Sequence, residues 1–331
     1  MSDTISSGGA SLIEKAAGRL ARLGPLPIEP RSPESRPLDP LPLKQPDLFS
    51  ARRAAKPAAT RPPERAVVPL DFQRLQADGF ITPNNTDARI SEEFRLIKRS
   101  ILRRYSEASG LNANIASNAA VASSANTIPN ANIIMVTSAI NGEGKTFTAI
   151  NLAMSIAFER DFRVLLVDAD LRKADLLNRL GIKPGPGLVD VLLDDSLDLA
   201  DVLLRTDLDG LTVLPSGRSH SLSTELLASK AMADLIDEIA KRYADRIVVF
   251  DTPPVLLTSE AAALTQHVGQ TVFVVRAEST SRETVKDALE VLRPARNLAL
   301  LLNAVYPQLG QSQPGYGSGR PYGRKASAGS R

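Results

Sequence analysis

The chain has 331 residues, 43% of them apolar, which suits one large or two modest globular domains. It has no cysteine, which excludes disulfides and thiolate metal sites. Its two histidines do not have the spacing of zinc ligands. The formal charge of +3 does not by itself indicate nucleic acid, and no such partner is expected. No apolar run approaches the roughly 18 residues that span a bilayer, and no signal-peptide pattern opens the chain, so we expect a cytoplasmic protein.

The first predicted element is an amphipathic helix within residues 1–25. Ser11 and Glu14 form a capping box, and Gly24 with Pro25 is a stop signal. Between them, apolar side chains share one face and basic side chains another, so the helix would contact an acidic membrane surface or a partner. The alternative is a helix of no function that frays in solution, because isolated helices this short are marginal.

A proline-rich segment follows. Twelve of the 23 prolines lie between Pro25 and Pro69. Such a sequence cannot bury enough apolar surface to offset its ordering entropy, so residues 26–80 are predicted to be a disordered linker. A helix is predicted after the linker at 91–104.

The rest of the sequence has the pattern of one α/β domain over residues 81–307. An Ala/Asn/Ser tract at about 107–131 is predicted to be a flexible insertion, and the Gly- and Ser-rich residues 308–331 a disordered tail. After the insertion, short apolar runs alternate with amphipathic segments, which predicts a mostly parallel sheet with helices on both faces. The predicted strands are 133–137, 164–167, 211–214, 247–250, 271–275 and 298–302.

The segment Thr137–Thr146, TSAINGEGKT, lies between the first strand and a predicted helix at 146–158. It matches the phosphate-binding pattern G-x-x-x-x-G-K-[ST], except that Ala139 replaces the first Gly. Glycines let backbone N–H groups turn toward phosphate oxygens, Lys145 adds a positive charge, and Thr146 offers a hydroxyl to Mg²⁺. Ala139 is acceptable if that residue needs no left-handed backbone conformation.

Acidic side chains follow two other predicted strands. LLVDADLR places Asp168, Asp170 and Arg172 after one, and VVFDTPP places Asp251 after another. The carboxyl ends of parallel strands converge on the ligand crevice, where carboxylates would hold Mg²⁺ beside a triphosphate. Any one aspartate could simply cap the next helix, but together with the loop they predict a nucleoside triphosphate site on a P-loop NTPase-type fold.

These three segments resemble the Walker A, Walker A′ and Walker B motifs of the bacterial tyrosine kinases. The opening SLIEKAAGRLARLG, the Pro-rich linker and the motif order are most similar to the tyrosine autokinases of exosortase-associated and exopolysaccharide loci. The resemblance covers roughly residues 87–307 and, more loosely, the first helix. It implies a protein-tyrosine autokinase that uses ATP and Mg²⁺ and regulates exopolysaccharide synthesis or export.

The resemblance also implies roles for single residues. Asp168 and Asp170 would position the metal and help to deprotonate the attacking tyrosine, while Asp251 would hold a Mg²⁺-bound water. Arg172 would orient the A′ loop or the phosphates, and Asn303 would contact adenine, unless it is an ordinary strand-end Asn. The implied catalytic residues are Lys145, Asp168, Asp170, Arg172 and Asp251. The implied metal ligands are Thr146, Asp168 and Asp251. The implied nucleotide-binding residues of the loop are Asn141, Gly142, Glu143, Gly144, Lys145, Thr146 and Phe147.

Five tyrosines are candidate phosphate acceptors. Tyr105 and Tyr243 lie in amphipathic segments and are expected to be packing residues. Tyr316 and Tyr322 lie in the predicted tail, where a flexible Gly-rich chain would let one subunit's tail enter a neighbour's site. Tyr306 would be a third acceptor in a sparse version of the family's tyrosine cluster. The alternative is a tail with incidental tyrosines.

The helix at 91–104 resembles the family's E-x-x-R-x-x-R assembly helix, with Glu92, Arg95 and Lys98 in the three places. A spacing of three keeps these charges on adjoining faces, where they would pair with a neighbouring subunit of a homo-oligomer, such as a ring. Lys98 replaces an arginine and cannot form its bidentate fork, so a weaker ring is expected. The alternative is a solvated charged face.

The resemblance implies partners as well. The activator would be a membrane polysaccharide co-polymerase (chain-length determinant) on a separate chain, which would hold the kinase peripherally at the inner membrane, and a tyrosine phosphatase would reverse the reaction. Two other functions stay open. A septum-site or partitioning ATPase shares the fold but has a signature lysine where this chain has Ile140. A non-catalytic ATP-binding adaptor is disfavoured by Lys145 and the three aspartates.

Overall fold

The computed structural model describes residues 67–85, 88–108, 128–219 and 223–305. The predicted N-terminal helix, most of the linker, most of the insertion, Tyr306 and the tail with Tyr316 and Tyr322 lie outside the described residues. The strands are β1 Ile133–Ser138, β2 Arg163–Asp168, β3 Leu204–Arg205, β4 Leu211–Leu214, β5 Arg246–Asp251, β6 Gln270–Arg276 and β7 Leu298–Asn303. The helices are α2 Phe72–Ala77, the 3-10 helix η1 Pro83–Asn85, α3 Arg89–Ala108, α4 Lys145–Ala157, α5 Leu176–Leu180, α6 Leu188–Leu193, α7 Leu199–Val202, α8 Ser223–Leu227, α9 Lys230–Arg242, α10 Ser259–Leu264 and α11 Arg282–Val291.

Seven strands form one sheet in the order β3-β4-β2-β5-β1-β6-β7. All neighbouring strands are parallel except the two-residue edge strand β3, which pairs antiparallel with β4. The central strands read as continuous apolar runs, IIMV, VLLV and IVVF, because both faces of a parallel sheet are covered. All six predicted strands are present within one residue at each end, and the predicted mostly parallel α/β fold is confirmed.

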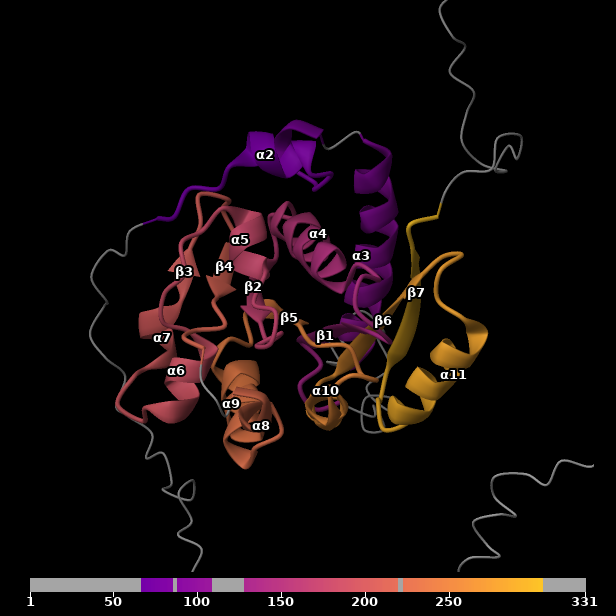
Figure 1. Ribbon diagram of the computed structural model, residues 1–331. Coiled ribbons are helices and arrows are strands. Elements are labelled where there is room, and N and C mark those ends of the chain that lie inside the picture. Colours follow the sequence, from indigo (N-terminus) through magenta and orange to yellow (C-terminus); the bar gives the residue numbers. More distant parts are fainter. Residues whose placement is uncertain (1–66, 86–87, 109–127, 220–222, 306–331) are drawn as a thin grey trace, which may run out of the picture. The chain divides into compact units, whose positions relative to one another are not determined.

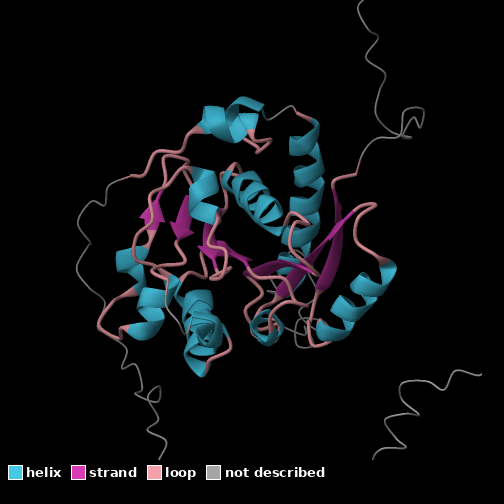
Figure 2. Cartoon of the chain, viewed as in Figure 1, coloured by secondary structure: helices cyan, strands magenta, loops and turns pink. Residues whose placement is uncertain are grey.

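Helices cover both faces of the sheet, and each face has its own apolar cluster. Helices α2, α3, α4 and α5 lie on one side, and α6 through α11 lie on the other (Figure 1). Figure 2 shows the strands as a central magenta layer between the cyan helices. Within the described residues, no helix combines the length and apolar character needed to cross a bilayer.

The structure corrects the end of the predicted linker. Residues 67–80, which were assigned to the linker, belong to the packed domain. The N–H of Val68 donates to the carbonyl of Arg205 at 2.8 Å, and the side chains of Leu75 and Phe80 are fully buried. The proline count concealed this segment, because the prolines continue as far as Pro69, inside it, while its apolar side chains pack in the same cluster as α3 and α4.

Candidate active site

The phosphate loop, residues 139–146, connects β1 at the centre of the sheet to α4. Gly142 and Gly144 have φ of +88° and +97°, conformations that L side chains rarely adopt. Ala139, at the position of the missing glycine, is fully buried and is absent from the positive-φ residues of the described chain. The expectation that alanine is tolerated there is confirmed, because the position needs no left-handed backbone.

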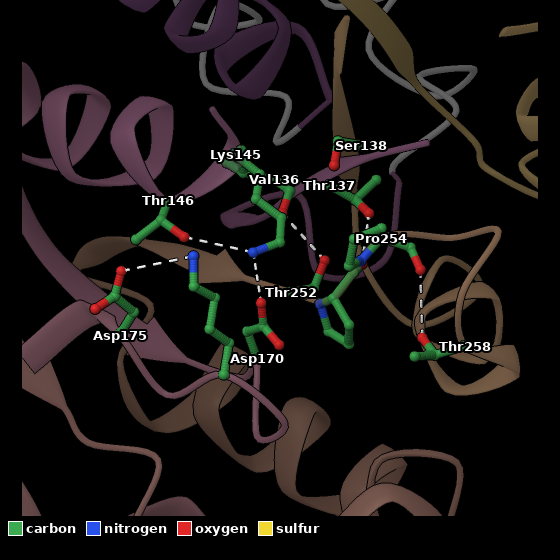
Figure 3. A network of polar contacts seen from close by, with 12 residues as sticks. Val136, Thr137, Ser138, Lys145, Thr146, Asp170, Asp175, Thr252, Pro254 and Thr258 are labelled. Carbon is green, nitrogen blue, oxygen red and sulfur yellow. Dashed lines mark hydrogen bonds and ion pairs between the residues drawn. The ribbon is translucent and has the colours of Figure 1, made fainter. Parts of the chain in front are cut away.

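Lys145 and Asp170 form a buried ion pair at the start of α4. Their Nζ and Oδ2 atoms are 2.5 Å apart, and both residues are almost completely buried. The ammonium also lies 3.4 Å from the Thr146 hydroxyl (Figure 3). The lysine therefore lies where the first turn of α4 presents free N–H groups, a position suited to binding an anion.

Asp168 and Asp251 end the neighbouring strands β2 and β5, where they are register partners. Both side chains are buried, and within the described residues Asp168 Oδ1 and Oδ2 and Asp251 Oδ1 have no hydrogen-bond partner. Burial raises the pKa of Asp168 well above its ordinary value, and the nearby carboxylates of Asp251 and Asp170 raise this pKa further. Burial raises the pKa of Asp251 to about 6, against the opposing charge of Lys145.

This donor set fits Mg²⁺. Buried carboxylate oxygens without partners are costly, and a divalent cation with oxygen preference would satisfy them. In the described part of the chain no group of three or more His, Cys, Asp or Glu side chains is arranged to hold a metal on its own. That also suits Mg²⁺, which commonly takes one or two carboxylates together with substrate phosphates and water.

The loops beside the phosphate loop are tied to it. The Thr137 hydroxyl donates to the carbonyl of Pro253 at 2.8 Å, and the N–H of Val255 donates to the carbonyl of Ser138 at 2.9 Å. Arg172 is exposed, and its Nη1 lies 3.5 Å from the carbonyl oxygen of Leu257. The Walker A′ and Walker B loops therefore meet at Arg172, which is consistent with its expected role in orienting the A′ loop.

Two of the implied nucleotide-binding residues have other contacts. The Phe147 ring points away from the loop and packs on Phe80 and Phe94, with centroids 5.1 Å and 6.4 Å apart, so its side chain belongs to the apolar cluster under α4. The ring therefore does not line the loop, and the assignment of Phe147 to the nucleotide site stays a prediction. The Asn303 amide donates to the carbonyl of Glu143 at 2.9 Å. An adenine contact by Asn303 stays a prediction.

The implied assembly residues on α3 do not share one environment. Lys98 is 4% exposed, and its ammonium contacts the carbonyl of Ser155 and the carboxylate of Glu159 within its own chain. This differs from the expected intersubunit role, because a buried ammonium already bonded to α4 has little left to offer a neighbour. Glu92 and Arg95 pair with each other on the helix surface.

The tyrosines inside the domain pack as expected. Tyr243 is buried in the core on the α9 side of the sheet, with the Arg246 guanidinium 4.7 Å from its ring centroid. Tyr105 packs partly buried against the α4 side. The candidate acceptors Tyr306, Tyr316 and Tyr322 lie outside the described residues.

Residues 131–298, just over half of the chain, match a family profile described as AAA domain. Tyrosine-protein kinase YwqD of Bacillus subtilis is 36% identical over 167 residues, which cover 50% of this chain and 69% of YwqD. Tyrosine-protein kinase CpsD of Streptococcus agalactiae is 32% identical over 198 residues, covering 58% of this chain and 82% of CpsD. The chain belongs to the bacterial tyrosine kinases.

Solved structures of this family share the fold. The kinase domain of the Escherichia coli tyrosine kinase ETK is 30% identical, with a TM-score of 0.50, over 57% of this chain and 72% of that one. The chimerical protein CapA2B2 is 27% identical, with a TM-score of 0.55, over 73% and 94% of the two chains. The chain matches only 25% of the length of EpsB from Ralstonia nicotianae and 21% of Wzc from Salmonella typhi.

Two residues at the site were not identified from the sequence. The Thr280 hydroxyl donates to Glu143 Oε1 at 2.5 Å, and Arg276 Nη1 donates to the carbonyl of Gly142 at 3.1 Å. Arg276 ends β6, the strand beside β1, and Thr280 lies in the loop that follows. The rule that located the aspartates, polar residues at the carboxyl ends of strands, would have found Arg276 had it been applied to every strand.

Proposed function

We propose that this chain is an ATP- and Mg²⁺-dependent protein-tyrosine autokinase that phosphorylates tyrosines near its C-terminus, Tyr316 and Tyr322, in neighbouring subunits. The observation that carries the proposal is the combination of a phosphate loop, the buried Lys145–Asp170 pair and two buried aspartates with unsatisfied oxygens at adjacent strand ends. Buried charges and unsatisfied carboxylates are expensive to fold, and their place at a strand-to-helix loop is typical of a ligand site.

The residues divide the reaction between binding and proton transfer. The first turn of α4 and Lys145 bind phosphate oxygens, and nucleotide must compete with Asp170 for the lysine. Asp168, Asp251 and the Thr146 hydroxyl would hold Mg²⁺, which offsets phosphate charge when bound. The phenolic oxygen forms a bond to the γ-phosphorus as the bond to the ADP oxygen breaks. The phenolic proton passes to an oxygen of Asp168.

The same proposal extends to the setting of the kinase. The relatives EpsB, CpsD and Wzc bear the names of polysaccharide-locus proteins, which supports a role in exopolysaccharide synthesis or export. We include self-association through the α3 surface around Glu92 and Arg95, activation by a membrane co-polymerase on a separate chain, and reversal by a tyrosine phosphatase. Through that activator the chain would be peripheral to the inner membrane.

The test is incubation of the full chain with Mg-ATP, followed by tandem mass spectrometry of the C-terminal peptides. We expect phosphate on Tyr316 or Tyr322, no phosphate in Lys145→Met, and none in the Tyr316→Phe/Tyr322→Phe double variant apart from any on Tyr306. Mixing inactive Lys145→Met with the active double variant should phosphorylate the tail of the former, since transfer is between subunits. ATP hydrolysis with an unmodified tail, even with the activator fragment present, would contradict the proposed autokinase activity and favour a partitioning-type ATPase.

A further inference from the structure

The phosphate loop is held from outside by three side chains that come from the far end of the chain. Arg276 Nη1 donates to the carbonyl of Gly142 at 3.1 Å, and the Asn303 amide donates to the carbonyl of Glu143 at 2.9 Å. The Thr280 hydroxyl donates to the Glu143 carboxylate at 2.5 Å. We call Arg276, Thr280 and Asn303 the loop clip.

Two of these contacts fix the direction of peptide groups. In a trans peptide the N–H points opposite to the C=O of the same unit, and the described chain has no cis peptide bond. Binding the Gly142 carbonyl to Arg276 therefore turns the N–H of Glu143 away from the clip. Binding the Glu143 carbonyl to Asn303 does the same for the N–H of Gly144. Inward N–H groups are what a phosphate-binding loop requires.

The third contact holds the side chain of Glu143. This residue is only 2% exposed, and its Oε2 accepts the N–H of Ile140 at 2.8 Å while its Oε1 accepts the Thr280 hydroxyl. The carboxylate thus joins the first residues of the loop to the segment after β6. A carboxylate buried here needs both donors, because an unsatisfied buried charge is costly.

The fit between the clip and the loop is close. A Cβ added to Gly144 would lie 2.0 Å from the Asn303 amide nitrogen, so a side chain at this position and the clip exclude each other. Gly144 also has a left-handed backbone, with φ of +97°. The glycine is therefore required both by its own conformation and by the approach of Asn303.

We propose that Thr280, together with Arg276 and acting through Glu143 and Gly142, is a positioning residue that pre-organises the phosphate loop for nucleotide. None of these side chains needs to touch the phosphates to do this. The inference rests on the proposed nucleotide binding and adds to it the residues that hold the loop before ligand arrives. Since the clip acts on the binding loop, its loss raises the dissociation constant for Mg-ADP and the KM for ATP, and leaves kcat within about twofold.

The experiment measures Mg-ADP binding by calorimetric titration of the full chain. Thr280→Val removes the donor while keeping the shape of the side chain, and we expect about tenfold weaker binding, the scale of one lost hydrogen bond to a charged group. Thr280→Ser keeps the hydroxyl and should restore binding. Thr284→Val is the matched control. It makes the same change four residues later, inside α11, and should bind Mg-ADP as the wild type does. Arg276→Met, at an exposed position, should bind about threefold more weakly and tests the clip if Thr280→Val does not fold.

A double-variant cycle separates positioning from general damage. If Thr280 acts through the Glu143 carboxylate, Thr280→Val adds nothing in a Glu143→Ala background. Equal binding by wild type, Thr280→Val and Arg276→Met would overturn the clip while leaving the proposed function intact. Failure of the folded wild-type chain to bind Mg-ADP would instead overturn the proposed function.

Discussion

Two buried lysines lie at opposite ends of α4, and their surroundings differ. Lys98, from α3, meets the C-terminal end of α4, where it donates to the carbonyl of Ser155 at 3.1 Å and pairs with the half-exposed Glu159. Lys145 lies in the first turn of α4, where the helix dipole disfavours a cation, and its pair with Asp170 is almost completely buried.

The difference separates a charge that serves folding from one kept for a ligand. The Lys98 end of the helix is complete, because the carbonyl of Ser155 and the carboxylate of Glu159 satisfy the ammonium, and the helix dipole favours it. The Lys145 end is incomplete, because buried carboxylate oxygens of Asp168 and Asp251 have no hydrogen-bond partner in the described part of the chain. An anion with a divalent cation would balance the charges at this end, and nothing comparable is needed at the other.

The largest effect is expected for Lys145→Met. Removing the only ammonium paired within the phosphate loop should lower the rate of tyrosine transfer by about a thousandfold, the upper scale for losing one preorganised electrostatic group. The fold should survive, because methionine retains the apolar stem of the buried lysine side chain. Phosphotyrosine formation and thermal unfolding of the same preparation check this. Transfer above a tenth of the wild-type rate in a folded variant would remove Lys145 from the reaction.

Lys98→Met tests the other end of α4. Methionine retains the buried stem but loses both bonds of the ammonium, so the free energy of unfolding should fall by about 1–3 kcal/mol, with the lower figure more apt since Glu159 is half-exposed. Transfer per folded molecule should change less than twofold. Urea unfolding measures the loss, and Glu159→Gln, which retains the bond to Ser155, should cost less. A variant of unchanged stability but reduced oligomer mass would restore the intersubunit role of Lys98.

The sequence predicted the central sheet well because both faces of its strands are buried. Runs such as VLLV and IVVF, rich in β-branched residues, are typical of strands buried between two helical layers, and their ends place Asp168 and Asp251 together. The segment at residues 67–80 was missed for a different reason. Its apolar side chains gain their burial from distant parts of the chain, and local composition does not reveal such contacts.

At the site, motif spacing identified the side chains expected to contact the ligand, but not the side chains that hold the phosphate loop in place. Lys145, Asp168 and Asp251 follow from the order of strands and loops. Thr280 could not be found this way, because its only signal is a hydroxyl whose partner lies 137 positions earlier. Phe147 adjoins the motif in sequence, but helix geometry turns its ring toward α3, which motif spacing does not reveal.

Asp168→Asn tests whether the unpaired carboxylates near the start of α4 destabilise the protein when Mg²⁺ is absent. The carboxylate is buried beside two others, so a neutral amide should raise the stability of the Mg²⁺-free protein by about 1 kcal/mol or more, or a few degrees in Tm, while abolishing transfer.

Asp251→Asn should also stabilise the Mg²⁺-free protein and abolish transfer, and its gain in stability should depend on pH. A folded-state pKa of about 6 means that the wild-type carboxyl is neutral and tolerated at low pH, and that stability is lost as pH rises through 6. The gain of the variant should therefore be absent near pH 4 and complete above pH 6. Differential scanning calorimetry across this range would contradict the argument if the gain were independent of pH.

The smallest effect on stability is expected at the surface of α3. Arg95→Ala removes an ion pair with Glu92 in which both side chains are more than a third exposed, so the free energy of unfolding should change by less than about 0.5 kcal/mol. If this face joins subunits, light scattering should nonetheless show a lower oligomer mass, and transfer between subunits should fall with it. Arg103→Ala is the matched control, since Arg103 forms a comparable exposed pair with Glu107 two turns further along the helix. Equal masses for both variants and the wild type would make the Glu92–Arg95 face ordinary solvated surface. Because the Lys98 ammonium already contacts Ser155 and Glu159 of its own chain, any contact between subunits would then have to use a different part of the molecule.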